Sequence, residues 1–503
     1  MDRDEYEGLI RRLEAESLSR PLAFRNKVLA ISAAAYVALF ATLGGIAGLL
    51  YWILVHASWR HHAAAMVKVG ILALMMLPVF FVVLRMLLMR LPKPEGREIG
   101  RSEAPKLFEV IDKMRHKLRG PPIHHVLIDR DYNAAIVQRP RFGLFGGHVN
   151  YLILGLPFLL GVAPKEMLAV IGHEYGHLCG AHGKIGAWVY RQRRTLGALY
   201  EKVRDNADAS FAHGLMANAL VRFMPVYNAY TFVLSRQNEY EADLTAGELV
   251  GTEHSADGLL RSALSGRWFA QDYWSTFHEQ ADVRIKPAFQ PYASMRMAFA
   301  ASYSQWANEE RLAEAWREDS DLLDTHPCLR DRVEAMGERK RVPPPVERTA
   351  AEALLGPFAK QLIDEFDQSW WKESKTKWET RYQYVTRAKG DLKKLSAQPL
   401  DAMPLHDLHE RALLTAEFES LAAAKPVLAH LIAQPGGPFP RAEYFYGCAL
   451  LAEEDENGLL HLETALNNDR AIAETAANTG YRYLRRKRGE AAADAWWNQV
   501  LPA

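Results

Sequence analysis

Two long apolar runs stand out near the start of the chain, at 28–55 and at 69–84, and the first contains no charged residue. About 20 apolar residues suffice to cross a bilayer. A cleaved signal peptide has a shorter apolar stretch, so the first run is too long and starts too late for one. The pattern predicts two transmembrane helices within 28–90, after a cytoplasmic segment 1–27. Buried core helices are the alternative.

The distribution of basic residues predicts how these helices are oriented. Loops rich in Lys and Arg stay on the cytoplasmic side. The connector between the two runs holds only Arg60 and Lys68, whereas six basic residues stand on each outer flank. Both flanks should therefore face the cytoplasm, and the remainder of the chain with them. We expect an integral protein of the inner or plasma membrane, in contact with the lipid bilayer, with cytoplasmic catalytic and C-terminal domains.

After the membrane segments the pattern alternates between short strands and longer helices. A linker at 91–100 leads to a helical stretch at 104–118, and period-two or short apolar runs predict strands at 124–129, 133–137 and 149–155. Pro164 opens a helix, since proline is favoured in the first turn. The fold class we expect is mainly α, with an α+β catalytic core at 91–340 that contains a small β-sheet.

The segment 211–234 is apolar but interrupted by polar side chains. It suits either a third membrane segment or a buried or membrane-surface helix.

A proline-rich stretch at 341–349 predicts a second linker, followed by a helical domain over 341–503. Two segments there, 442–469 and 473–500, each carry aromatic and small residues in a first helix and alanines with large apolar residues in a second. This is the pattern of degenerate tetratricopeptide-like repeats, which bind protein partners, although an ordinary helical domain would also fit.

The composition argues against nucleic-acid binding and suggests a reducing compartment. The 61 basic and 60 acidic side chains give a net charge of +1, which argues against a nucleic-acid-binding protein. Three widely separated cysteines do not suggest a disulfide framework. A reducing compartment is the simplest interpretation and agrees with the expected topology.

The chemistry concentrates in HEYGH at 173–177. On a helix, positions i and i+4 share a face, so His173 and His177 can bind one metal ion. Glu174 can then take a proton from a zinc-activated water and pass it to the leaving amine. The HExxH motif alone is moderate evidence for a metal site, because a helix with two solvent-exposed histidines can have the same sequence. The apolar surroundings favour the metal, since unpaired buried His and Glu side chains would be costly.

A catalytic zinc site needs a third protein ligand. Glu239, in SRQNEYEAD at 235–243, is the best candidate, and Asp243 one turn later can hold the free ring nitrogen of a ligating histidine. Glu241 points elsewhere on the helix. From spacing alone, a solvated helix face remains the alternative for Glu239.

Together these motifs resemble the integral-membrane zinc endopeptidases that include HtpX and the CAAX prenyl proteases. The resemblance rests on HEYGHLCGAH at 173–182, SRQNEYEAD, the strand-like NAAI at 133–136 and THPCLRDR at 325–332. It covers about residues 90–340. It implies one zinc ion per chain, with Glu239 as third ligand and Asp243 beside the site.

The resemblance also implies further functional residues. It places His326 and Arg332 near the catalytic centre, to stabilise the oxyanion, to hold substrate backbone or, for His326, to act as a latch on the metal. Asn133, Ala134 and Ala135 would belong to an edge strand beside the substrate. His182 is the weaker candidate and is better explained as structural. Fewer predicted spans than in these relatives make prenylated substrates doubtful.

Three functions of different classes remain open. The preferred hypothesis is a membrane-anchored zinc endopeptidase that acts on proteins or peptides, in membrane protein quality control. A repeat-based adaptor with a vestigial zinc domain is the second, although the intact Glu174 argues against it. A zinc-dependent hydrolase of a non-peptide substrate is the third.

Overall fold

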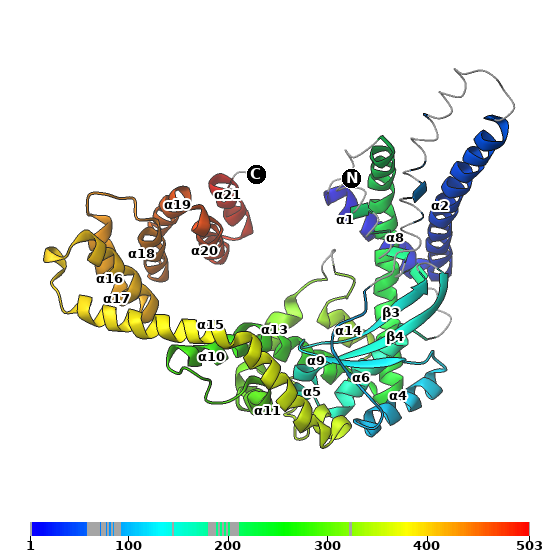
Figure 1. Ribbon diagram of the computed structural model, residues 1–503, viewed down its shortest axis with the longest axis horizontal. Helices are drawn as coiled ribbons and strands as arrows, with labels where there is room; N and C mark the ends of the chain where they lie inside the picture. Colours follow the sequence, from blue (N-terminus) through cyan, green and yellow to red (C-terminus); the bar gives the residue numbers. More distant parts are fainter. Residues whose placement is uncertain are drawn as a thin grey trace. The chain divides into compact units, whose positions relative to one another are not determined.

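In the computed structural model the described residues are 3–57, 92–142, 145–179, 211–320 and 324–501, with scattered residues between 71 and 84 and between 188 and 201. Helices dominate, and one small sheet is present among these residues (Figure 1). This agrees with the expected mainly α fold with an α+β core. The chain forms two compact units, of which the first comprises 1–277 and 289–370 and the second 278–288 and 371–503. The predicted boundary at residue 341 stays a prediction.

The first unit contains the sheet and the motifs HEYGH, SRQNEYEAD, NAAI and THPCLRDR. Its four strands are β1 (Arg97–Ile99), β2 (His125–Asp129), β3 (Ala134–Phe142) and β4 (Phe145–Gly155). Its main helices are α1 (Arg3–Ser19), α2 (Pro21–Ala57), α4 (Pro105–Leu118), α5 (Leu156–Gly161), α6 (Pro164–Gly176), α8 (Phe211–Val250) and α9 (Thr252–Trp268). Shorter helices follow: η2 (Phe269–Tyr273), α10 (Trp274–His278), α11 (Pro291–Ala301), α12 (Tyr303–Trp306), α13 (Glu309–Arg317), α14 (Leu329–Ala335) and η4 (Ala351–Leu355).

The strands are arranged in the order β1-β2-β4-β3. The β2–β4 pair is parallel and the other two pairs are antiparallel. Because β3 is the last strand in this order, it lies at an edge of the sheet. Apolar residues of the central strands, among them Leu127, Ile128, Leu152 and Leu154, are fully buried. The helix α6 packs against β3, α8 and α9 (Figure 1). The edge strand and the helix that carries HEYGH therefore lie together.

Two features position α6. Pro164 stands in its first turn, and the Glu166 carboxylate accepts a 2.7 Å hydrogen bond from the backbone N–H of Ala163. That bond satisfies one of the amide groups that a helix start leaves without an intrahelical partner. The same carboxylate accepts two hydrogen bonds from the Arg261 guanidinium of α9, at 2.7 and 2.9 Å, and both side chains are buried. The start of α6 is thus fixed to α9 by a buried ion pair.

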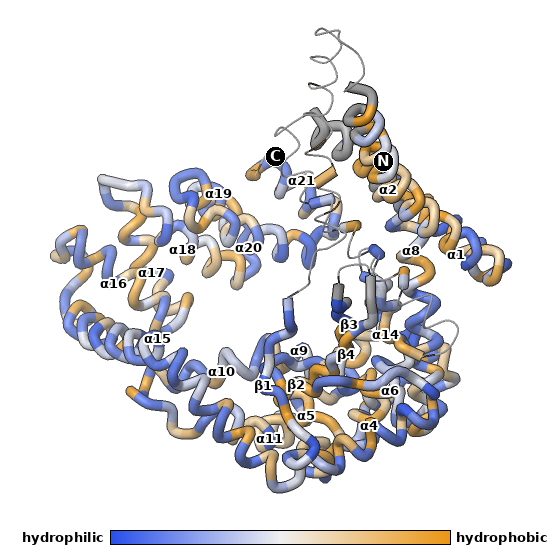
Figure 2. The backbone as a smooth tube through the Cα atoms, turned by 45° about the vertical axis from the view of Figure 1, so that its right-hand side comes forward, coloured by the Kyte–Doolittle hydropathy of each residue, from blue (hydrophilic) through white to orange (hydrophobic). Residues whose placement is uncertain are grey.

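The helix α2 is the part of the described chain that meets the requirements of a membrane span, over Pro21–Leu49. Its residues are mostly apolar (Figure 2), and only 19% of its most apolar window is buried. A core helix would be largely buried, so this exposure weakly favours a membrane anchor. Most of the second predicted span, 69–84, lies outside the described residues. The helix α8, which includes the ambiguous stretch 211–234, does not meet the same requirements over its described residues.

The helix α1 packs on α8 beside the start of α2. Its apolar residues Ile10 and Leu13 share a buried cluster with Phe232 and Val233 of α8. Glu14 adds an ion pair to Arg236 at 2.7 Å. The amino-terminal segment is therefore packed against the helix that bears Glu239.

The second unit is helical over its described residues. It contains the second half of α15 (Phe358–Ser396), then η5 (Leu400–Ala402), α16 (Leu405–Phe418), α17 (Leu421–Ile432), α18 (Pro440–Ala452), α19 (Gly458–Asn468), α20 (Arg470–Arg488) and α21 (Glu490–Val500), and the turn η3 (Glu279–Asp282). From α16 onward each helix packs on the next. The last four helices correspond to the two predicted helix pairs and share a core that includes Leu462, Ala476 and Trp496. Their identification as tetratricopeptide-like repeats remains a prediction.

Candidate metal centre

Close approach of α6 and α8 builds the site. Two glycines on α6 allow it: a Cβ on Gly172 would lie 2.7 Å from the Leu249 side chain, and one on Gly176 would lie 3.3 Å from the backbone of Ala242. Each glycine directly precedes a histidine of the HEYGH motif. The glycine pair therefore brings the histidine-bearing turn of α6 against α8. The two glycines are visible in the sequence, but helical spacing does not show that a second helix packs there.

The three predicted ligands meet at this contact. The Nε2 atoms of His173 and His177 are 3.2 Å apart. The Nε2 atom of His173 lies 3.4 Å from Oε2 of Glu239, and the Nε2 atom of His177 lies 3.4 Å from Oε1 of the same carboxylate. Together they form a group that could hold a metal ion. Glu241, on the same helix, is exposed and is not part of this group.

The distance between the two nitrogens, and the distance from each nitrogen to its nearer carboxylate oxygen, are close to those around a tetrahedral ion. Ligand atoms about 2.0–2.1 Å from such an ion are separated from one another by about 3.3–3.4 Å. A further observation supports the fit: the Oε2 atom of Glu239 is buried and accepts no hydrogen bond, which would be costly without another partner. Two imidazole nitrogens and a carboxylate are the donor set of catalytic zinc sites. The described residues therefore fit a zinc ion.

Asp243 lies one turn beyond Glu239 and faces the other ring nitrogen of His173. The distance from Oδ1 to Nδ1 is 2.9 Å. Arg332 of α14 holds the same carboxylate at two points, with Nε to Oδ2 at 2.8 Å and Nη2 to Oδ1 at 2.7 Å. Asp243 is thus fixed between the histidine and the arginine, in the place expected of a residue that orients a ligand.

The ionisable groups of the site shift one another's pKa values strongly. Burial lowers the pKa of His173, but the carboxylates of Asp243 and Glu239 outweigh it and raise that pKa to about 9. Burial and the neighbouring His173 lower the pKa of His177 to about 4. Burial tends to raise the pKa of Glu239, yet the two histidines hold it at about 2. The Glu239 carboxylate is ionised and His177 is neutral, which are the forms that coordinate a metal, whereas His173 has to release a proton when it binds one.

Glu174 lies between the ligand pair and the edge strand. Its Oε2 atom accepts a 3.1 Å hydrogen bond from the backbone N–H of Ile136 on β3. Burial raises its pKa. A carboxylate with a raised pKa beside a metal site has the properties of a proton acceptor that can later give the proton back.

The predicted edge residues precede Ile136. The carbonyl of Asn133 accepts a hydrogen bond from Gly155 of β4 at 2.8 Å, so by alternation the backbone groups of Ala134 and Ile136 point away from β4. The N–H of Ala134 is held by the Asn133 side chain at 2.8 Å. Ala135 lies on the same strand and pairs with Ile153. The three predicted residues therefore lie at the free side of the sheet, next to Glu174.

His326 lies at the rim of the site. Its Nε2 atom is 3.7 Å from Oε2 of Glu239, and 55% of its side chain is exposed. Arg332 faces Asp243, and its Nη2 atom is 4.0 Å from Oε2 of Glu239. His182 lies outside the described residues. The structure thus brings seven of the predicted residues to one place, namely Glu174, His173, His177, Glu239, Asp243, His326 and Arg332, and Ile136 adds the edge strand to them.

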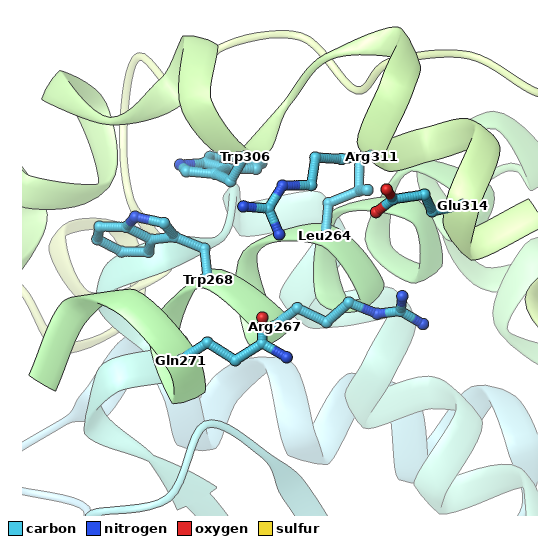
Figure 3. Close-up of a pocket in the computed structure, with 7 residues that line it drawn as sticks. All are labelled: Leu264, Arg267, Trp268, Gln271, Trp306, Arg311 and Glu314. Atoms are coloured by element: carbon cyan, nitrogen blue, oxygen red, sulfur yellow. The ribbon is translucent and has the colours of Figure 1, made fainter. Parts of the chain in front are cut away.

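A separate cavity of about 120 Å³ lies on the first unit, between α9, η2, α12 and α13 (Figure 3). It is lined by Leu264, Arg267, Trp268, Gln271, Trp306, Arg311 and Glu314. Among its described lining residues, none belongs to the predicted site. Arg267 is paired with Glu318, and Arg311 lies 3.8 Å from Asp272, so both cations already have acidic neighbours.

Comparison with known proteins gives one match. No curated protein and no solved structure matches the chain. Residues 117–340, however, match the model of Peptidase family M48. That segment contains the predicted ligands, the glutamate between them and the edge strand. The match therefore supports a metallopeptidase of family M48 in this part of the chain.

Proposed function

We propose that the chain is a zinc-dependent endopeptidase anchored in a membrane by its amino-terminal helices. The observation that carries the proposal is the close approach of His173, His177 and Glu239, whose ligand atoms gather within 4.8 Å of one another and form a donor set typical of catalytic zinc. The family match supports the peptidase class. The finer resemblance to HtpX and the CAAX prenyl proteases belongs to this proposal.

A bound zinc ion would polarise the substrate carbonyl and lower the pKa of a water molecule. The side chains then have separate tasks. Glu174 accepts the proton of the attacking water and transfers it to the leaving amine. Its hydrogen bond to Ile136 keeps its carboxylate against the edge strand, so the acceptor and the substrate site are held together.

The substrate is an extended peptide that lies along β3. The outward carbonyl groups of Ala134 and Ile136 can accept hydrogen bonds from a further strand, while their N–H groups are held by the side chains of Asn133 and Glu174. Main-chain pairing selects the extended conformation and not a particular side chain. An endopeptidase with broad preference for unfolded segments is the specificity that this arrangement supports.

Three residues support the reacting groups. Asp243 orients His173, and Arg332 holds Asp243 in place through its two hydrogen bonds. His326 carries its Nε2 atom at the rim of the site, where it would stabilise the negative charge that develops on the substrate carbonyl oxygen. If His326 instead acts as a latch on the ion, its removal speeds turnover.

The membrane location rests on α2 and on the distribution of basic residues. The helix is long and apolar enough to span a bilayer. The catalytic and C-terminal domains would face the cytoplasm, and membrane or membrane-proximal proteins would be the substrates, as in quality control. A protein-binding role for the helical tail is part of the same proposal.

Hydrolysis by the purified full-length protein tests the function. The wild type, loaded with zinc, should cleave an unstructured peptide internally, and Glu174→Gln should keep the metal and lose the activity. Glu241→Gln is the matched control, since that carboxylate is on α8 but outside the ligand group. A fully active Glu174→Gln would remove the mechanism. Cleavage of small esters but of no peptide would favour the hydrolase alternative.

An adaptor with a vestigial zinc domain predicts a different result. Such a protein would bind partners through its tail equally well with or without Glu174, and it would cleave nothing.

A further inference from the structure

The side chain of His326 is more than half exposed, yet one of its nitrogens faces the metal centre. An exposed side chain loses rotamer freedom when it is held in one orientation, so some contact has to stabilise that orientation. Pro327 and the segment around it restrict the backbone, but they leave the ring free to rotate about its side-chain bonds. The position of the ring therefore needs a partner of its own.

Asp324 supplies that partner. Its Oδ1 atom lies 2.9 Å from Nδ1 of His326 and also accepts the backbone N–H of His326 at 2.9 Å. Both contacts use one oxygen two residues away, so the carboxylate fixes the backbone and the ring together. With Nδ1 engaged, the nitrogen left to face the site is Nε2, the one that lies 3.7 Å from Glu239.

The segment that carries this pair is itself fixed to the protein. The backbone N–H of Cys328 donates to the Ser320 hydroxyl at 2.8 Å. Arg332, on the helix that starts at Leu329, is bound to Asp243 inside the site. The backbone that follows the Asp324–His326 pair is therefore held at Cys328 and at Arg332, and the Asp324 carboxylate determines the direction of the ring.

We propose that Asp324 is a positioning residue that holds the His326 imidazole with Nε2 directed at the metal centre, through a carboxylate–imidazole hydrogen bond. This inference rests on the proposed function, because it assigns His326 a part in peptide hydrolysis. Asp324 itself touches neither the ligand group nor the edge strand among the contacts of the described residues. Its effect on turnover passes through His326.

A double-mutant cycle on the zinc-loaded full-length protein tests the proposal. We expect Asp324→Ala to lower kcat about tenfold with little change in KM or zinc content, and His326→Ala to lower it by about 10²–10³. The double variant should be no slower than His326→Ala, since the carboxylate then has no ring to orient. Asp324→Asn, which keeps an acceptor oxygen, should recover most of the activity.

Asp319→Ala is the matched control, because Asp319 is an exposed carboxylate of the same segment that pairs with Arg330. It should stay within about twofold of the wild type, because its partner Arg330 is not a residue of the metal centre and an exposed ion pair adds little stability. Losses that multiply in the double variant, or an unchanged kcat in Asp324→Ala, would overturn the proposal.

A readout without catalysis separates this inference from the proposed function. In protein labelled at histidine Cε1, the His326 resonance is identified by its loss in His326→Ala. It should move in Asp324→Ala and stay in place in Asp319→Ala. A wild type that cleaves no peptide would refute the proposed function, while a His326 resonance unaffected by Asp324→Ala would refute the role of Asp324.

Discussion

Buried charge is the residue-scale feature that most constrains this fold. Arg261 is fully buried, and it forms two hydrogen bonds to Glu166 and one to the carbonyl of Pro344 at 2.5 Å. Removal of one member of a buried ion pair leaves the other charge unpaired, which costs about 3–5 kcal/mol. Because Glu166 also starts α6, the loss would reach the metal centre.

We therefore expect Arg261→Leu to lower the free energy of unfolding by about 3–5 kcal/mol, measured by denaturation of the purified protein. Arg101→Ala, which breaks the exposed pair with Asp112, should have no measurable effect. Equal stability of both variants would show that the buried pair is not what holds α6 to α9.

Some residues of the metal centre can be predicted from the sequence, and others cannot. Helical spacing predicts His173, Glu174 and His177, whereas Glu239 is predicted as a ligand only through the resemblance of SRQNEYEAD to the family motif. Asp324 was not, because an acidic residue two positions before a histidine has no distinctive spacing. The partner of Arg332 was also missed, since a contact between α14 and α8 depends on tertiary packing across 89 residues of sequence.

At the scale of elements, the edge strand is the feature that function depends on. Strand positions 124–129, 133–137 and 149–155 were predicted within a few residues of β2, β3 and β4, because short apolar runs bounded by turn residues have few other interpretations. The order of the strands was not predictable from those runs. It follows from pairing between distant residues, which a local pattern does not encode.

The outward N–H of Ile136 can be removed without loss of the sheet ladder. Proline is tolerated at an edge position whose N–H does not face the neighbouring strand. We expect Ile136→Pro to keep zinc and the fold but to lower kcat/KM for peptides at least tenfold, because Glu174 loses its 3.1 Å partner and the strand loses a donor. Steady-state kinetics with metal analysis would check this. Unchanged kinetics would show that β3 takes no part in substrate binding.

At the scale of the whole molecule, the segment after the peptidase core is the part that sequence described least well. The proline-rich stretch at 341–349 reads as a linker, yet its neighbourhood packs within the first unit. Ala350 donates its N–H to Val162 at 2.9 Å, and Asp367 accepts the N–H groups of Tyr292 and Ala293. Composition alone does not distinguish a free linker from an ordered one.

Two truncations should therefore behave differently. Deletion of 397–503 removes the helices after α15. It should leave zinc binding and cleavage of a short peptide largely intact. If the tail recruits substrates, the same deletion should reduce cleavage of a folded or membrane protein. Deletion of 345–503 should destabilise the peptidase core, because it removes the packing of Ala350 and Asp367. Thermal unfolding and activity on both substrates are the measurements. Equal loss on both substrates after the shorter deletion, with the protein still folded, would discard recruitment.

Topology is a second prediction at this scale. Reporter fusions at residues 20 and 110 should both read cytoplasmic, and a fusion at residue 60 should read external, since the basic residues stand on the outer flanks of the two apolar runs. An external reporter at residue 110 would place the peptidase core on the other side of the membrane and overturn the proposed localisation.

Metal content tests the central claim most directly. After removal of bound metal with a chelator and reloading, the wild type should hold about one zinc ion per chain, and Glu174→Gln and Glu241→Ala should do the same. Glu239→Ala should bind zinc far more weakly, because the site then loses one of its three protein ligands. Stoichiometric zinc of wild-type affinity in Glu239→Ala would contradict the assignment of the centre to His173, His177 and Glu239.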